Sequence, residues 1–253
     1  MRIEVTPLSD VFGAEVTGAD INRWDDNEQF EQIRQAFLDH GVIAIRNQRI
    51  DPAAQIAFAS RFGTLQEHVL SKFCLPGYPK ILVLSNRRTN DEPIGIADAG
   101  RHWHSDMSYA ERPPLGSMLY AHEIPPEGGD TLFANQYLAY EALSEGMRKM
   151  LDKLVAVHDN RVQAPNATPE RNAKMTSKLR DDPDEEDEPE MEHPVVRTHP
   201  ETGRKALFVC RPRTHRFKGM AETESKPLLE FLFDHSHRPE FTCRFRWEKG
   251  SIA

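Results

Sequence analysis

Short runs of alternating or wholly apolar residues, separated by glycine and proline turns, dominate this sequence. One such turn (PPEGGD, residues 125–130) leads directly into an apolar run. The predicted strands cover residues 2–5, 42–45, 81–84, 115–121, 131–133, 206–210 and 241–247. This pattern favours a mixed α/β chain with a mainly β core, a sandwich or barrel with helices packed outside it.

Helical periodicity is confined to a few segments. Residues 28–40 place Phe30, Ile33 and Phe37 on one face, which predicts an amphipathic helix. Asp51 followed by Pro52 is typical of a helix start, and that helix is expected to run to residue 61. Residues 137–154 predict one or two helices, and residues 222–236 predict the last one.

The charge of the chain is concentrated in one place. The net charge is −8, and nine acidic residues lie between positions 181 and 192, so the remainder is about neutral. A nucleic-acid-binding surface is therefore not expected. Residues 160–192 have no apolar periodicity and predict a solvated, mobile acidic loop within a single domain spanning residues 1–253. A divalent-cation or partner site in the acidic run is the alternative.

Composition also bears on the location of the protein. No apolar run reaches the roughly 18 residues of a membrane span, and the N-terminus has no signal-peptide or transit-peptide pattern. The three cysteines have no metal-like spacing. We therefore expect a cytoplasmic protein without disulfides, not bound to a membrane.

The sharpest chemical signal is the sequence Trp103-His104-Ser105-Asp106. On a strand, residues i and i+2 point to the same face, so His104 and Asp106 would converge. One imidazole and one carboxylate are two of the three ligands in a 2-His-1-carboxylate iron site. The alternative is a surface histidine and a turn aspartate that bind no metal. Two further histidines are candidate ligands. A flanking role is favoured for His102, and a turn-structuring role is favoured for His199.

Six segments then occur in an order that resembles the TauD/TfdA family of Fe(II)- and 2-oxoglutarate-dependent dioxygenases. They are FLDHGVIAIRNQ, SRFGTL, WHSDMSY, GGDTLFANQYLAYEAL, HPVVRTHPETGRKALFV and FRWEKGSIA. The resemblance implies a double-stranded β-helix (jelly roll) with flanking helices. It also implies Fe(II) as metal and 2-oxoglutarate as cosubstrate.

The resemblance assigns roles residue by residue. His104 and Asp106 look like metal ligands, and Thr131 like the residue that hydrogen-bonds the cosubstrate carboxylate remote from the metal. Met107 matches a main-chain cosubstrate contact, and His68 matches a substrate-side histidine. Residues 160–192 correspond to a segment that includes a mobile lid in relatives.

Two departures from the family pattern affect these expectations. Ser71 and Gly100 stand where taurine-specific relatives have a tyrosine and an asparagine, so a substrate other than taurine is expected. After Trp247-Glu248-Lys249-Gly250 the family continues into a segment with the distal metal histidine and a cosubstrate-binding arginine. This chain ends at Ala253, so an incomplete jelly roll without the third ligand is expected.

The implied activity is hydroxylation of a small anionic organic acid by O2, with release of succinate and CO2. The substrate would be a sulfonate, a sulfate ester, or an aryloxy or other carboxylate. The alternative is a catalytically inactive jelly-roll remnant that acts as a binding module. The sequence leaves the oligomeric state open, with a homo-oligomer as one option.

Overall fold

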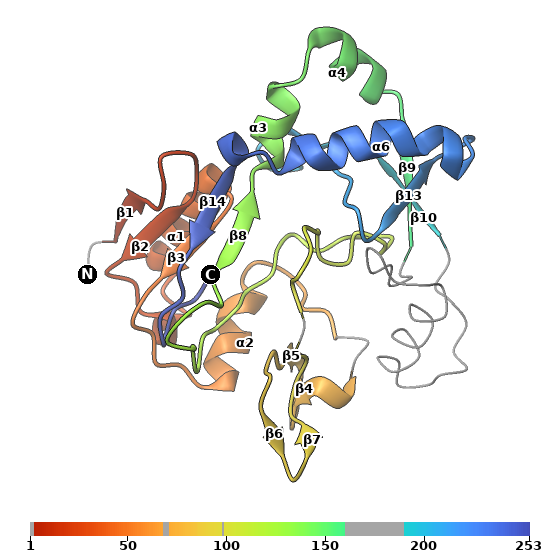
Figure 1. Ribbon diagram of the computed structural model, residues 1–253. Coiled ribbons are helices and arrows are strands. Elements are labelled where there is room, and N and C mark those ends of the chain that lie inside the picture. The colour runs from red at the N-terminus through yellow and green to blue at the C-terminus, as the bar shows by residue number, and fades with distance from the viewer. Residues whose placement is uncertain (1–2, 68–70, 98, 160–189) are drawn as a thin grey trace.

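Among the residues that the structure describes, six small sheets and five α-helices form most of the regular structure (Figure 1). The structure is a computed structural model that describes residues 3–67, 71–97, 99–159 and 190–253. The predicted mixed α/β class is confirmed. Within these ranges the sheets have two or three strands and none closes into a barrel, so the jelly-roll detail is not seen there.

The N-terminal sheet has the order β1-β2-β3, with β1 (Glu4–Pro7) antiparallel and β3 (Ile43–Ile45) parallel to β2 (Ala14–Thr17). Helix α1 (Asn27–His40) contacts β2 and β3 and buries one face into a core shared with α2 (Pro52–Ser60). The Asp26 and Asp51 side chains accept the hydrogen bonds that cap the two helices. Both helices that the sequence predicted here are confirmed.

Residues 250–253 lie beside β3 and pair with two separate segments. Ile252 exchanges two backbone hydrogen bonds with Ile45, each 2.8 Å long, and Ala253 exchanges two with Leu119. The strand predicted at residues 115–121 is therefore wrong in extent, because only Tyr120 forms a ladder bridge there. The backbone hydrogen bonds that residues 250–253 make with this stretch involve Leu119 and Ala121, at its C-terminal end.

A second sheet has the order β10-β9-β13, comprising Met191–Pro194, Val155–His158 and Thr214–Phe217, all antiparallel. Helix α6 (Glu222–Ser236) packs against β13 and runs across this sheet, with α3 (Gln136–Glu141) and α4 (Glu145–Leu151) beyond it (Figure 1). The side chains of these elements form a second core cluster, which includes Leu151, Ala156, Phe217 and Leu232.

Four smaller pairs complete the described sheets. Strand β8 (Thr131–Ala134) pairs with β14 (Thr242–Phe245), which brings Thr131 opposite Phe245. The other three pairs are β11 (Val196–Thr198) with β12 (Lys205–Leu207), β4 (Cys74–Leu75) with β5 (Tyr78–Leu82), and β6 (Arg88–Thr89) with β7 (Glu92–Pro93). The 3-10 helices are Ile21–Arg23, Ser71–Phe73 and Pro239–Phe241.

The predicted acidic loop lies mostly outside the described residues, which resume at Glu190. Glu190 and Glu192 form ion pairs with Arg216 (2.6 Å) and Lys218 (2.7 Å) across the second sheet. The predicted boundary at residue 192 is thus wrong, because strand β10 has begun by then. Such half-exposed pairs contribute less than about 1 kcal/mol each.

Candidate metal site

The side chains of His104 and Asp106 lie together. Nε2 of His104 is 3.1 Å from Oδ1 of Asp106. Two ligands at right angles around an octahedral divalent ion, each about 2.1 Å from it, are about 3 Å apart. The distance between these two atoms is therefore that of two adjacent ligands of one ion.

The convergence does not come from a strand, as the sequence reasoning assumed. His104 lies in an irregular segment, and Asp106 opens a turn that spans residues 106–109. Trp103 stacks on the ring of His237 at the end of α6, with a centroid distance of 5.5 Å and an interplanar angle of 6°. Packing and a turn, rather than strand alternation, bring the two side chains to the same point.

Each of the two side chains is oriented by a further hydrogen bond. Nδ1 of His104 donates to the carbonyl oxygen of His102 at 2.7 Å, which leaves Nε2 as the atom that faces Asp106. The Ser117 hydroxyl donates to Oδ2 of Asp106 at 2.6 Å, which leaves Oδ1 facing His104. Metal-binding histidines and carboxylates carry outer contacts of this kind.

The pair is accessible and holds a proton more tightly than an isolated histidine would. The hydrogen bond to Asp106 raises the pKa of His104, against the lowering effect of partial burial, and the contact with the His102 carbonyl adds to the rise. The two side chains are 37% and 53% exposed. A cation arriving from solution would displace this proton and take both donor atoms.

The two donors fit two adjacent coordination positions of a ferrous ion, since they combine a neutral nitrogen with an anionic oxygen. In the described ranges, no third histidine, cysteine, aspartate or glutamate joins them in a metal-binding group. Nδ1 of His199 accepts the backbone hydrogen bonds of Glu201 and Thr202, so the turn role favoured for His199 is confirmed.

Met107 follows the pair in a left-handed backbone conformation, with φ of +47°. A residue with a Cβ pays roughly 1–2 kcal/mol for this conformation. Such strain persists only where the surrounding structure imposes it, and it is concentrated at functional sites. The Met107 carbonyl accepts a hydrogen bond from the Ala110 amide at 2.9 Å, which closes the turn.

Thr131 is placed by a different element, the first residue of β8. Its Oγ1 accepts a hydrogen bond from the indole Nε1 of Trp247 at 2.9 Å. Because Trp247 uses a lone pair of that oxygen, the hydroxyl hydrogen of Thr131 remains to be donated to another acceptor. His68, the remaining predicted site residue, lies outside the described residues.

Comparison with known proteins identifies the family. A family model described as "Taurine catabolism dioxygenase TauD, TfdA family" matches residues 4–253. The chain belongs to the TauD/TfdA family. The resemblance predicted from the six sequence segments is confirmed, and the family implies iron and 2-oxoglutarate, with O2 and a small organic substrate.

Three similar TauD/TfdA proteins cover nearly the whole chain. It is 32% identical to the alpha-ketoglutarate-dependent sulfate ester dioxygenase of Pseudomonas putida, over 100% of this chain and 81% of that protein. It is 30% identical to the alpha-ketoglutarate-dependent 2,4-dichlorophenoxyacetate dioxygenase of Cupriavidus pinatubonensis, over 100% of this chain and 88% of that protein. The crystal structure of a taurine dioxygenase from Burkholderia xenovorans superposes with a TM-score of 0.77 at 35% identity, covering 99% of this chain and 79% of that one. By family, the protein is a 2-oxoglutarate-dependent dioxygenase.

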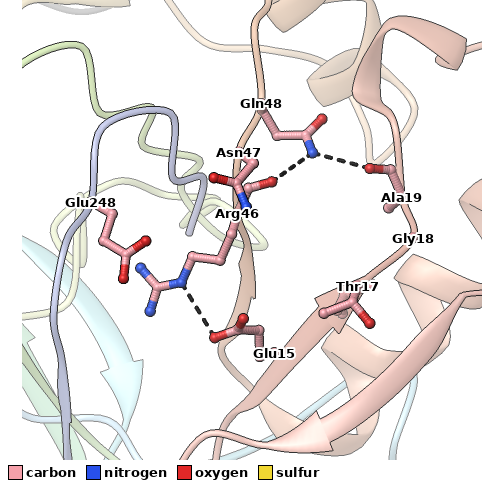
Figure 2. A pocket seen from close by; sticks show the side chains of 9 residues that line it. Glu15, Thr17, Gly18, Ala19, Arg46, Asn47, Gln48 and Glu248 are labelled. Carbon is pink, nitrogen blue, oxygen red and sulfur yellow. Dashed lines mark hydrogen bonds and ion pairs between the residues drawn. The ribbon is translucent and has the colours of Figure 1, made fainter.

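A polar pocket of about 380 Å³ lies elsewhere in this TauD/TfdA chain, between the N-terminal sheet and Glu248 (Figure 2). Arg46 lines this pocket, and its Nε is 3.3 Å from Oε2 of Glu15. Its Nη1 donates hydrogen bonds to the Arg246 carbonyl and to the Ser251 hydroxyl. Arg46 therefore holds β3 against the last residues of the chain. None of the predicted site residues lines this pocket.

Sequence reasoning missed the residues that support the pair. Ser117 lies eleven positions after Asp106, and no local pattern marks it as a partner. Cys210, in the segment after β12, and His158, in β9, contact the same turn from distant parts of the chain. Among the described residues, no helix is both long and apolar enough to traverse a lipid bilayer.

Proposed function

We propose that the protein is an Fe(II)- and 2-oxoglutarate-dependent dioxygenase that hydroxylates a small organic acid and releases succinate and CO2. The observation that carries the proposal is the 3.1 Å approach of His104 Nε2 to Asp106 Oδ1, with the outer atoms of both side chains hydrogen-bonded elsewhere. The substrate class is a sulfonate, a sulfate ester, or an aryloxy or other carboxylate. Its support is that named relatives act on a sulfate ester and on 2,4-dichlorophenoxyacetate.

In this proposal His104 and Asp106 bind the iron. Thr131 donates its hydroxyl hydrogen to the carboxylate of 2-oxoglutarate that is remote from the metal, and the main chain at Met107 contacts the cosubstrate. His68 lies on the substrate side. These residues belong to one domain, residues 1–253, with a jelly-roll core.

The residues of the chain act by holding groups in place. When bound, iron and 2-oxoglutarate supply the oxidation of a C–H bond by O2. The His102 carbonyl keeps Nε2 of His104 available as a ligand, and Ser117 fixes the plane of the Asp106 carboxylate. Trp247 fixes the direction in which the Thr131 hydroxyl donates.

The metal site is tested by anaerobic addition of Fe(II) and 2-oxoglutarate. We expect a visible charge-transfer absorption from the wild-type chain and its loss in His104→Ala and Asp106→Ala. His102→Ala is the matched control, because the substitution keeps the backbone carbonyl that accepts the hydrogen bond from His104. Absence of the band, together with no succinate after O2 is admitted, contradicts the proposal and favours a non-catalytic binding module.

The substrate is tested separately with a panel of alkylsulfonates, alkyl sulfate esters and aryloxyacetates, measured as succinate released above the uncoupled rate. Taurine is included because Ser71 and Gly100 replace residues expected in taurine-specific relatives. Stimulation by taurine alone would contradict the expectation of a substrate other than taurine, and stimulation by no member of the panel would contradict the proposed substrate class.

A further inference from the structure

Four buried polar side chains form a cluster directly beneath the turn that carries Asp106. They are Ser108, His158, Cys210 and Thr214, exposed by 1%, 0%, 7% and 3% respectively. We name them the Ser108 cluster. They come from four separate parts of the chain: the turn itself, β9, the segment after β12, and β13.

Hydrogen bonds connect the members of the Ser108 cluster. The Ser108 hydroxyl lies 3.7 Å from the Cys210 sulfur and 3.3 Å from Nδ1 of His158. The Thr214 hydroxyl accepts the Cys210 amide at 3.0 Å and lies 3.4 Å from the same His158 nitrogen. In one consistent arrangement the thiol donates to Ser108, and the Ser108 hydroxyl donates to Nδ1 of His158.

Cys210 contacts the turn at two positions on either side of Asp106. The Ser105 backbone lies near enough to the sulfur to oppose part of the rise in the thiol pKa, and the Ser108 hydroxyl lies 3.7 Å from the sulfur. Burial raises the pKa of the Cys210 thiol, so it remains neutral and acts through hydrogen bonds rather than through charge. Ser105 and Ser108 bracket both Asp106 and the strained Met107.

A neighbouring strand holds the end of the same turn. Nε2 of His193, on β10, donates to the Ala110 carbonyl at 3.0 Å. The sheet β10-β9-β13 and the segment after β12 thus hold residues 105, 108 and 110, whereas the Asp106 side chain between them points to Ser117 and His104. This arrangement keeps the left-handed Met107 in place and sets the direction in which Asp106 leaves the backbone.

We propose that Cys210 is a positioning residue, whose buried thiol, hydrogen-bonded to Ser108 and packed beside the Ser105 backbone, holds Asp106 beside His104 in the geometry for binding a divalent metal. This inference rests on the proposed function, because it takes His104 and Asp106 as the ligands. Cys210 touches neither side chain in this role and acts through the backbone of the turn.

The test compares two buried cysteines. Cys210→Ala removes the thiol from the Ser108 cluster, and Cys243→Ala removes an equally buried thiol from β14, which lies in another sheet. Ser108→Ala removes the same hydrogen bond from the other side with a smaller loss of volume, and it serves if Cys210→Ala does not fold. Cys210→Ser keeps a donor and acceptor at the position.

Two measurements are made on the full chain. The first is Mn(II) binding in the presence of 2-oxoglutarate, followed by loss of the free Mn(II) electron paramagnetic resonance signal. The second is amide hydrogen exchange of residues 105–110 without metal. We expect Cys210→Ala to weaken Mn(II) binding about tenfold, as for other outer contacts of metal ligands, and to speed exchange in the turn. Cys210→Ser should recover most of the affinity, and Cys243→Ala should match the wild type in both measurements.

The outcomes separate the two proposals. Equal Mn(II) affinity for wild type and Cys210→Ala, with affinity lost in His104→Ala, overturns the positioning role and leaves the metal site standing. A loss in Cys243→Ala as large as in Cys210→Ala also overturns it, since general destabilisation then accounts for both. Equal binding by wild type and His104→Ala overturns the proposed function and, with it, this inference.

Discussion

His158 makes a large contribution to the pH dependence of stability. Its ring is fully buried in β9, and its pKa is lowered from 6.5 to about 3, chiefly by burial. The positive or protonatable groups of His193, His215 and Arg197 contribute to this lowering, and Asp159 acts in the opposite direction. The folded state therefore keeps His158 neutral at pH values where the unfolded chain binds a proton.

The sign and size of the effect follow from proton linkage. At pH values well above 6.5, His158 is neutral in both the folded and the unfolded state, so its titration costs no stability. As the pH falls from 6.5 towards 3, the unfolded state binds a proton that the folded state excludes, and the free energy of unfolding decreases. From about pH 7.5 to about pH 5.5 the loss from this one residue is about 1.4 kcal/mol. That is a substantial fraction of the roughly 5–15 kcal/mol of stability of a typical folded protein.

The assay is urea unfolding of the wild type and of His158→Phe at the two pH values. Phenylalanine keeps a ring of similar shape but cannot bind a proton, so His158→Phe is expected to lose about 1.4 kcal/mol less than the wild type between those pH values. Its stability at neutral pH will differ because the Ser108 and Thr214 contacts are lost, but that offset does not depend on the protonation of residue 158. Parallel pH dependences for the two proteins would refute the reasoning.

Three further predictions concern single hydrogen bonds. Ser117→Ala should weaken Mn(II) binding about tenfold with little change in melting temperature, because it frees the Asp106 carboxylate to rotate; unchanged affinity would contradict this. Trp247→Phe should raise the KM for 2-oxoglutarate about threefold to tenfold, measured by succinate release, because the Thr131 hydroxyl loses its orienting partner; a fall in kcat alone would count against it. Asp51→Ala should lower the free energy of unfolding by about 1 kcal/mol through loss of the α2 cap, and an unchanged urea midpoint would show that the cap contributes nothing.

The helices were predictable because their signals are local. The amphipathic spacing of residues 28–40 and the Asp51-Pro52 start correspond to α1 and α2, and Ser144 caps α4. Residues 222–236 match α6 at both ends. A helix satisfies its own backbone hydrogen bonds, so its limits depend mostly on neighbouring residues.

Strand extents were less predictable because strand partners lie far away in the chain. The run at residues 115–121 has the composition of a strand, yet its pairing is limited to the residues near Tyr120 that meet Ile252. Glu192 has the composition of an acidic loop, yet it lies in β10 and pairs with Lys218. In both cases a distant segment, absent from any local window, decides the outcome.

The sequence by itself determined the helices, the enzyme family and the two donor types, since an imidazole and a carboxylate two positions apart are visible in the chain. Only the tertiary structure decided how these two side chains meet: a turn, not a strand, with Ser117 and Cys210 holding it from positions 11 and 104 residues beyond Asp106. The physical reason is that metal geometry depends on ångström-scale orientation. Contacts between segments remote in sequence set that orientation, whereas residue order specifies only which chemical groups are available.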